Sequence, residues 1–400
     1  MTRPLSHKAG LLHEHPTRKI DAIRERLSRE GKDLYLLSTG QPSIPPPYEL
    51  RKYLSDLLLE EDIKLYSYTP SGGLEELREA IAYDMKILSG ISLDPRSEIA
   101  VTTGGQEGMF ITLSTILDED DEVILFEPAY FGYKPLIEYL GCKVTSIATS
   151  LEDKFQPNIE MLKDMITSKT KAIIIVSPDN PTGRIINVEV AKAIADLAVD
   201  HDLWIVYDEA YKTIIYEGEH LWMYKLAPER TIAINAFSKD PGVPGWRIGY
   251  IYGPSEVVKA ARLMSENISY CPPSFSQISM LYYLKRRLRE KFLKEVLEIY
   301  KSRRDVLVEE LENKLPDARF IKPKGSMFIF VDFSKYLKEL RTDSEGFAKN
   351  LLLKCRVAVI PGTYFGSSCK DFIRLSFVAE PEDRLRKAIK VIREYIELLK

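Results

Sequence analysis

Residues 231–250 read T-I-A-I-N-A-F-S-K-D-P-G-V-P-G-W-R-I-G-Y, and this stretch is the starting point for predicting the fold. Its first six residues are mostly apolar, as is typical of a strand that is buried on both faces. The loop that follows is rich in glycine and proline and holds Lys239, with Arg247 eight positions further on. A buried strand that ends in a charged loop indicates a parallel sheet with polar residues at the carboxyl ends of its strands.

Similar apolar runs recur along the chain and alternate with amphipathic helical stretches. This alternation predicts an α/β fold whose large domain has a mainly parallel, seven-stranded sheet between helices. The expected strands are residues 99–103, 122–126, 143–148, 171–177, 203–208, 231–236 and 247–252, and the expected helices are 107–117, 133–140, 159–166 and 188–200.

The regular alternation of apolar runs and helical stretches ends after residues 271–273. A smaller α+β domain is expected from there on. Helix 18–30 of the N-terminal part is expected to join this small domain. We therefore predict an N-terminal arm with part of the small domain (1–48), a large domain (49–290) and a small C-terminal domain (291–400). The elements expected in the C-terminal part are a long charged helix at 280–315, open to a break, strands at 327–332, 358–360 and 372–377, and a last helix at 382–399.

The composition excludes several classes of protein. With 45% apolar and 29% charged residues, 400 residues are enough for a globular chain with a large core. The net charge of −3 offers no basic surface to nucleic acid or to anionic membranes. No apolar run approaches the roughly 18 residues of a transmembrane helix, and we expect no signal peptide. The four cysteines lack metal-ligand spacing, so we predict a cytoplasmic protein without a metal.

Lys239 and Arg247 are the first candidate site residues. Partial desolvation at the end of a buried strand lowers the pKa of an amine and frees its lone pair, so Lys239 is a candidate for Schiff-base chemistry. The planar guanidinium of Arg247 suits the bidentate binding of a phosphate. A solvated loop charge is the alternative interpretation of Lys239.

Other polar residues also lie near the ends of expected strands. Gly104 and Gly105 permit a sharp turn that presents backbone N–H groups to an anion at a helix N-terminus. Asn180 either marks a turn or donates its amide to a ligand oxygen. Asp208 ends an apolar strand, and a buried carboxylate needs a cation, from a structural salt bridge or from a ligand. Arg374 lies within an apolar strand and likewise needs a carboxylate, from the protein or from a substrate.

Taken together, these motifs resemble the fold-type I pyridoxal-phosphate enzymes, specifically the class I and II aminotransferase family. The likeness extends from Gly40 to Arg374, with the motifs in the order of the family. It implies a transaminase that moves an amino group between an L-amino acid and a 2-oxo acid by a ping-pong mechanism. It also implies pyridoxal 5'-phosphate as the cofactor, bound by the large domain.

The resemblance implies how the matching residues would act on the cofactor ring. Lys239 would form the Schiff base and then move a proton on the substrate. Asp208 would pair with the pyridinium nitrogen and support the ring as an electron sink. Tyr211 and Asn180 would hydrogen-bond the phenolic oxygen, and Tyr130 would stack on the ring.

The phosphate end of the cofactor would be held by the glycine turn, Gly104, Gly105 and Gln106, together with Arg247. Many relatives have a serine three residues before the lysine, where this chain has Ala236. One neutral hydrogen bond of about 1 kcal/mol would then be missing, so either the affinity for the cofactor is lower or Ser238 compensates.

The substrate would be held by its α-carboxylate, which the resemblance assigns to Arg374 with the backbone of Gly40 opposite. Tyr130 and Asn180 are expected to contact it as well. Tyr68 matches a tyrosine that reaches the neighbouring site across a dimer interface, which implies a homodimer.

The substrate side chain stays open at this stage. Some aspartate-specific relatives have a lysine where this chain has Gln106, which weakens the expectation of an acidic substrate. The residues in or beside the matching loops favour apolar or aromatic side chains, unless they are simply core: Tyr66, Tyr130, Phe131, Tyr364 and Phe365.

Two other functions share part of this pattern. A pyridoxal-phosphate-dependent lyase, catalysing β-elimination or an aminocyclopropane-carboxylate-synthase-like reaction, would carry largely the same motifs. A ligand-sensing domain of a transcription regulator is disfavoured, because Gly40 and Tyr68 come too early for a DNA-binding domain ahead of them.

Overall fold

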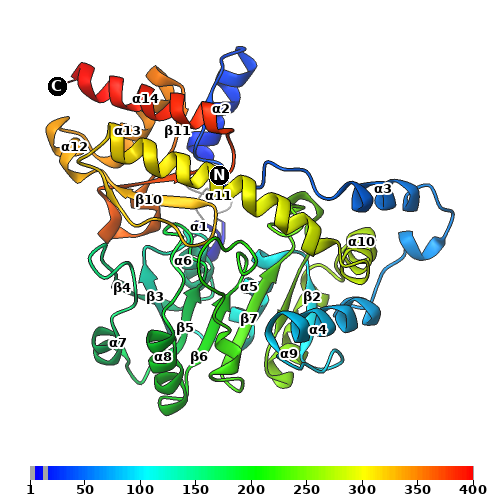
Figure 1. Ribbon diagram of the computed structural model, residues 1–400. Helices are drawn as coiled ribbons and strands as arrows, with labels where there is room; N and C mark the ends of the chain where they lie inside the picture. The colour runs from blue at the N-terminus through cyan, green and yellow to red at the C-terminus, as the bar shows by residue number, and fades with distance from the viewer. Residues whose placement is uncertain (1–4, 12–16, 400) are drawn as a thin grey trace.

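The computed structural model describes residues 5–11 and 17–399, and at its centre is a seven-stranded sheet (Figure 1). The strand order is β2-β8-β7-β6-β5-β3-β4, and β8 alone runs antiparallel to its two neighbours. The predicted mainly parallel sheet is therefore confirmed. The strands are β2 (Ile99–Thr102), β3 (Glu122–Glu127), β4 (Lys143–Ala148), β5 (Thr170–Val176), β6 (Trp204–Asp208), β7 (Thr231–Ala236) and β8 (Gly249–Tyr252).

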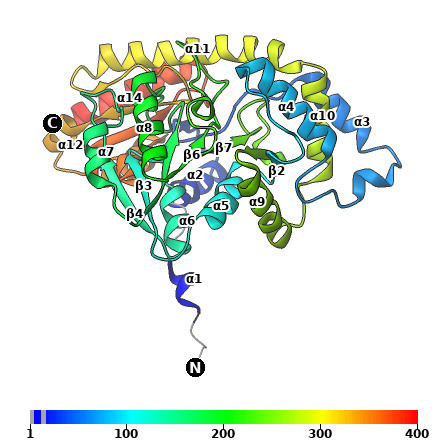
Figure 2. The same ribbon diagram turned by 90° about the horizontal axis from the view of Figure 1, so that it is seen from below.

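Helices cover both faces of this sheet (Figure 2). Strand side chains alternate between the faces, so in β5 Ile174 and Val176 pack on one side while Ile173 and Ile175 pack on the other. One face is covered by α5 (Gly105–Ile116), α6 (Tyr133–Tyr139) and α9 (Ser255–Ile268). The other is covered by α4 (Glu75–Ser89), α7 (Ile159–Met165), α8 (Val188–Asp200) and α10 (Ser274–Lys285).

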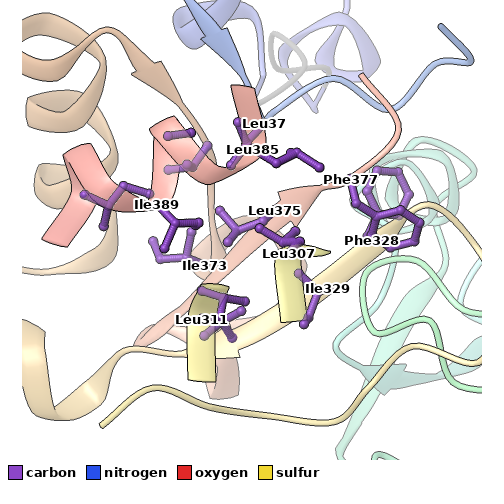
Figure 3. Packing of buried hydrophobic residues seen from close by; sticks show 14 of the residues in the cluster. Leu37, Leu307, Leu311, Phe328, Ile329, Ile373, Leu375, Phe377, Leu385 and Ile389 are labelled. Carbon is purple, nitrogen blue, oxygen red and sulfur yellow. The ribbon is translucent and has the colours of Figure 1, made fainter. Parts of the chain in front are cut away.

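The C-terminal part forms a second, four-stranded antiparallel sheet in the order β12-β13-β10-β9. Leu375 of β13 packs with Leu307 and Leu311 of α11 and with Ile389 of α14 in one buried cluster (Figure 3). The elements are α11 (Leu288–Lys314), β9 (Arg319–Phe320), β10 (Phe328–Asp332), α12 (Ser334–Glu339), α13 (Ser344–Asn350), β12 (Ile360–Pro361), β13 (Phe372–Ser376) and α14 (Glu382–Leu399).

The N-terminal part joins this C-terminal part, as expected for the small α+β domain. β1 (Tyr35–Leu36) pairs in parallel with β11 (Val357–Ala358). α2 (Arg18–Arg29) packs through Ile20 against the same region (Figure 1). The boundaries at 48/49 and 290/291 stay predictions. The remaining elements are α1 (His7–Leu11), α3 (Tyr48–Leu57) and the short turns η1 (Ile63–Tyr66), η2 (Met223–Lys225), η3 (Pro244–Trp246), η4 (Leu351–Cys355), η5 (Gly362–Phe365) and η6 (Ser367–Cys369).

The strand expected at 358–360 is divided between β11 and β12, which belong to different sheets. Left-handed backbone explains a late start of the strand expected at 247–252 and the break that was left open in the helix expected at 280–315. The strand expected at 247–252 begins only at Gly249, because Arg247 has φ +52° after the η3 turn. The helix expected at 280–315 is divided into α10 and α11, because Arg287 has φ +51°. A non-glycine residue rarely adopts this conformation, so an arginine at either position does not indicate it from the sequence.

Among residues 5–11 and 17–399, no helix combines the length and apolar character needed to cross a membrane.

Candidate active site

A cavity of about 450 Å³ opens at the carboxyl ends of the parallel strands. Val176, Asp208 and Ala236, the last residues of β5, β6 and β7, all line it. This is the position at which open α/β sheets form their sites. Every residue predicted for the site except Gly104 and Tyr68 lines this cavity: Gly40, Gly105, Gln106, Tyr130, Asn180, Asp208, Tyr211, Ser238, Lys239, Arg247 and Arg374.

Lys239 follows β7 and extends its amine into the cavity. Its Nζ donates a hydrogen bond to the carbonyl of Gly40 at 2.7 Å and lies 5.6 Å from the centre of the Tyr211 ring. Desolvation lowers the pKa of this amine to about 8, helped by the nearby Arg374 and opposed by Asp208. Near neutral pH a larger fraction of this amine is therefore neutral than for an ordinary lysine.

Asp208 ends β6 and holds a carboxylate without a protein counter-ion. Its Oδ2 accepts a hydrogen bond from the Tyr133 hydroxyl at 2.7 Å, and its Oδ1 accepts one from the N–H of Ala210 at 2.9 Å. Within the described part of the chain, it forms no ion pair with a lysine, arginine or histidine, so the alternative of a structural salt bridge is wrong there. Burial raises the pKa of this carboxyl.

Tyr133 is a site residue that the sequence analysis missed. It begins α6 and lies three positions after Tyr130, and the two ring centres are 5.3 Å apart. The available signal was a second tyrosine three positions after Tyr130, across a turn in which the Tyr133 N–H donates to the Tyr130 carbonyl at 3.1 Å.

Arg374 lies in β13, between β12 and β10, and is almost fully buried. Its guanidinium lies 4.1 Å from the centre of the Phe328 ring and donates to Asn180 Oδ1 at 3.0 Å and to the Ser38 carbonyl at 2.9 Å. Its Nε has no hydrogen-bond partner among the described residues. Desolvation lowers the pKa of the guanidinium to about 10. No carboxylate of the described residues forms an ion pair with Arg374, so of the two alternatives this buried cation suits an anion from a ligand.

The glycine turn and Arg247 meet at the opposite end of the cavity. Gly104 has φ +84°, and a Cβ at this position would collide with the Arg247 guanidinium. Arg247 donates to the carbonyls of Pro244 at 2.9 Å and Thr103 at 3.3 Å. The first N–H groups of α5 have no partner within the helix, and they begin at Gly105. Backbone donors and a guanidinium together make an anion site.

Tyr68 lies outside the cavity. It is 80% exposed, and its ring centre lies 4.6 Å from that of Tyr270 in an edge-on contact. Within a single chain this tyrosine therefore takes no part in the cavity.

The chain matches the family model described as aminotransferase class I and II over residues 32–392. It is 35% identical over 389 residues to the aspartate/prephenate aminotransferase of Thermus thermophilus, covering 97% of each chain. It is 32% identical over 399 residues to aromatic-amino-acid aminotransferase 2 of Thermococcus litoralis, covering 96% of this chain and 98% of the relative.

Solved structures agree with this match. The Thermus thermophilus aspartate aminotransferase with maleate superposes with a TM-score of 0.92 at 34% identity, covering 98% of this chain and 100% of that one. An aromatic aminotransferase from Pyrococcus horikoshii gives a TM-score of 0.86 at 32% identity, covering 94% and 99%. The chain is a transaminase and belongs to the class I and II aminotransferase family.

Proposed function

We propose that this chain binds pyridoxal 5'-phosphate in the cavity and uses it to transfer an amino group from an L-amino acid to a 2-oxo acid. The observation that carries the proposal is the buried carboxylate of Asp208, without a protein cation, in the same cavity as the amine of Lys239. A pyridinium nitrogen would be the cation that this carboxylate lacks. The family uses this cofactor.

The other lining residues fit the remaining parts of the cofactor. The glycine turn (Gly104, Gly105, Gln106) and Arg247 offer backbone and guanidinium donors to a phosphate, and Ser238 lines the same cavity. Because Arg374 donates to the oxygen of the Asn180 amide, the NH₂ group of that amide is left to donate to the ring oxygen, as the Tyr211 hydroxyl can. When bound, pyridoxal phosphate supplies an electron sink that stabilises negative charge at the substrate's α-carbon.

The protein's own part is to orient the substrate and to move one proton. Arg374 is proposed to grip the α-carboxylate by two parallel hydrogen bonds, because its guanidinium is buried and has an unused Nε. Such a grip supplies orientation, so its loss should lower turnover as well as binding. Lys239, with a pKa of about 8, is suited to take a proton from the α-carbon and return it near neutral pH.

The names of the relatives leave the substrate side chain open. They include aspartate/prephenate and aromatic-amino-acid aminotransferases at similar identity. We therefore propose a ping-pong transfer of the amino group between amino acids and 2-oxo acids, without naming their side chains.

The test is an absorption spectrum of the purified protein, before and after adding single amino acids without any 2-oxo acid. A yellow protein that bleaches with particular amino acids supports the proposed half-reaction, and Lys239→Ala should abolish it. A yellow protein that releases ammonia instead of bleaching would indicate a lyase. A protein that stays colourless with added pyridoxal phosphate would contradict the cofactor assignment.

We also propose a homodimer in which Tyr68 completes the phosphate site of the neighbouring chain. Its exposure supports this, as does that of nearby apolar side chains such as Leu59 (83%) and Ile63 (72%), since contiguous exposed apolar surface marks interaction sites. A cytoplasmic location remains a prediction from the sequence.

A further inference from the structure

The cavity contains a fourth cation to which the proposed function gives no role. Arg24 of α2 lines it together with Thr17 and Asp21 of the same N-terminal segment. Among the described residues that line the cavity, the other cations are those already discussed at the amine, phosphate and α-carboxylate positions. Arg24 is therefore available for another part of the substrate.

Residues 38–40 connect Arg24 to two of those cations. Each of these three consecutive residues accepts a hydrogen bond from a different cationic side chain, and consecutive Cα atoms are only about 3.8 Å apart. The contacts are Ser38 O with Arg374 Nη2 (2.9 Å), Thr39 Oγ1 with Arg24 Nη1 (3.3 Å) and Gly40 O with Lys239 Nζ (2.7 Å).

This arrangement places Arg24 beside the position proposed for the substrate. An amino acid whose α-carboxylate is held by Arg374, and whose α-carbon faces Lys239, extends its side chain from between these two groups. The guanidinium of Arg24 is anchored on the residue between their two backbone acceptors. Arg24 also lines the same cavity as Arg374 and Lys239, so a substrate side chain that extends into this cavity can meet its guanidinium.

Arg24 has hydrogen-bonding capacity to spare. Its Nη2 lies 3.2 Å from Asp21 Oδ1, in a pair whose side chains are 28% and 32% exposed. An ion pair this open to solvent is weak, and a guanidinium carries five N–H donors. A substrate carboxylate can therefore bind beside Asp21 or in its place.

We propose that Arg24 binds the second carboxylate of a dicarboxylic substrate, so that the preferred amino donor and 2-oxo acid have short acidic side chains. This rests on the proposed function, because it takes the α-carboxylate to be at Arg374. The expectation against acidic substrates came from Gln106, whereas this cation comes from a different element, α2. An aromatic side chain packed against Tyr130 and Phe131 is the competing occupant.

The experiment compares the holoenzyme with Arg24→Gln and with Arg26→Gln. Arg26 is the matched control, since it lies on the same helix, is 63% exposed, pairs with Glu30 and does not line the cavity. Two readouts are the dissociation constants of succinate and 3-phenylpropionate, from spectral titration, and kcat/KM with aspartate and phenylalanine as donors. Loss of a hydrogen-bonded charge predicts a weakening of about 10- to 100-fold for succinate and aspartate in Arg24→Gln alone. Binding of 3-phenylpropionate and turnover of phenylalanine should be unchanged.

Three outcomes would overturn the inference. In the first, Arg24→Gln weakens binding and turnover equally for the dicarboxylic ligands and for the aromatic ones. In the second, it does not weaken binding of succinate or turnover of aspartate. In the third, the unmodified enzyme uses phenylalanine and not aspartate. In each, the unmodified protein remains a working transaminase. If it reacted with none of the single amino acids of the spectral test, the proposed function itself would fail, so the two failures are distinguishable.

Discussion

At the scale of single residues, three charged side chains of the cavity have a pKa shifted by desolvation and form no ion pair within 4 Å among the described residues: Asp208, Lys239 and Arg374. Desolvation raises the pKa of the carboxyl and lowers those of the amine and guanidinium, so in each case it disfavours the charged form. Uncompensated buried charge opposes folding. We infer that this site trades stability of the empty protein for ligand binding.

Asp208→Asn should therefore raise the melting temperature of the cofactor-free protein at pH 7 while removing most of the activity. Because the folded-state pKa of Asp208 lies above its ordinary value, its charged form destabilises the fold at neutral pH, and this cost disappears as the pH falls through the folded pKa. Thermal melting at pH 7 measures the effect.

The matched control is Asp179→Asn. Burial also raises the pKa of Asp179, but its carboxylate accepts the Thr182 N–H at 3.0 Å and lies 3.6 Å from Arg184. Its loss should destabilise the fold by about 1–3 kcal/mol. A comparable loss of melting temperature in Asp208→Asn would contradict the inference that the charge of Asp208 destabilises the empty protein.

Tyr133→Phe should weaken cofactor binding and lower turnover, because it removes the 2.7 Å hydrogen bond to Asp208 that holds the carboxylate in place. A hydrogen bond to a charged group contributes about 1.5–3 kcal/mol, which corresponds to roughly 10- to 100-fold in affinity. Titration of the cofactor-free protein with pyridoxal phosphate checks this. The control variant Tyr139→Phe changes the other end of α6 and should bind pyridoxal phosphate with normal affinity. If the unmodified protein and both variants had equal affinities, Tyr133 would have no role in cofactor binding.

At the scale of elements, the turn between β2 and α5 decides where the phosphate end can form. Gly104 adopts φ +84° and ψ 169°, a conformation that is essentially restricted to glycine. The same residue lies against Arg247, which itself has a left-handed backbone. The Gly104 turn, the Arg247 guanidinium and the N-terminus of α5 therefore pack against one another, and a substitution in the turn is expected to displace the guanidinium.

Gly104→Ala should cost about 1–3 kcal/mol of stability from backbone strain and should displace Arg247. Denaturant unfolding measures the first effect, and the affinity for inorganic phosphate or pyridoxal phosphate measures the second. Gly245→Ala is the control in the same region, since its Cβ would meet nothing within 4 Å. If Gly104→Ala and Gly245→Ala had the same affinity for phosphate, the contact between the turn and Arg247 would have no role in phosphate binding.

At the scale of the whole molecule, the site is assembled from distant parts of the chain. Lys239 donates a hydrogen bond to the carbonyl of Gly40. Arg374 donates hydrogen bonds to the carbonyl of Ser38 and to the amide oxygen of Asn180. The N-terminal part, the central sheet and the C-terminal sheet each supply one wall. The proposed dimer would add a fourth contribution from the partner through Tyr68.

A complementation assay tests that dimer. Lys239→Ala and Tyr68→Ala, each of low activity, should recover activity when they are mixed and allowed to exchange chains. One site of the mixed dimer would then have both an intact lysine and an intact partner tyrosine. Lys239→Ala mixed with Asp208→Asn is the control, because both residues line the same cavity of one chain and no intact site can form. Recovery in neither mixture would refute the shared site.

Local sequence patterns were enough to predict the fold class, the seven-stranded sheet and the polar residues at the centre of the cavity. Apolar periodicity is a local property, and the polar residues that follow buried strands must meet at one edge of a parallel sheet. The folded chain was needed to show that Asp208 forms no ion pair among the described residues, that Tyr133 donates a hydrogen bond to it, and that Arg24 lines the same cavity. These facts depend on contacts between residues far apart in the chain, and no local pattern specifies which side chains desolvate one another.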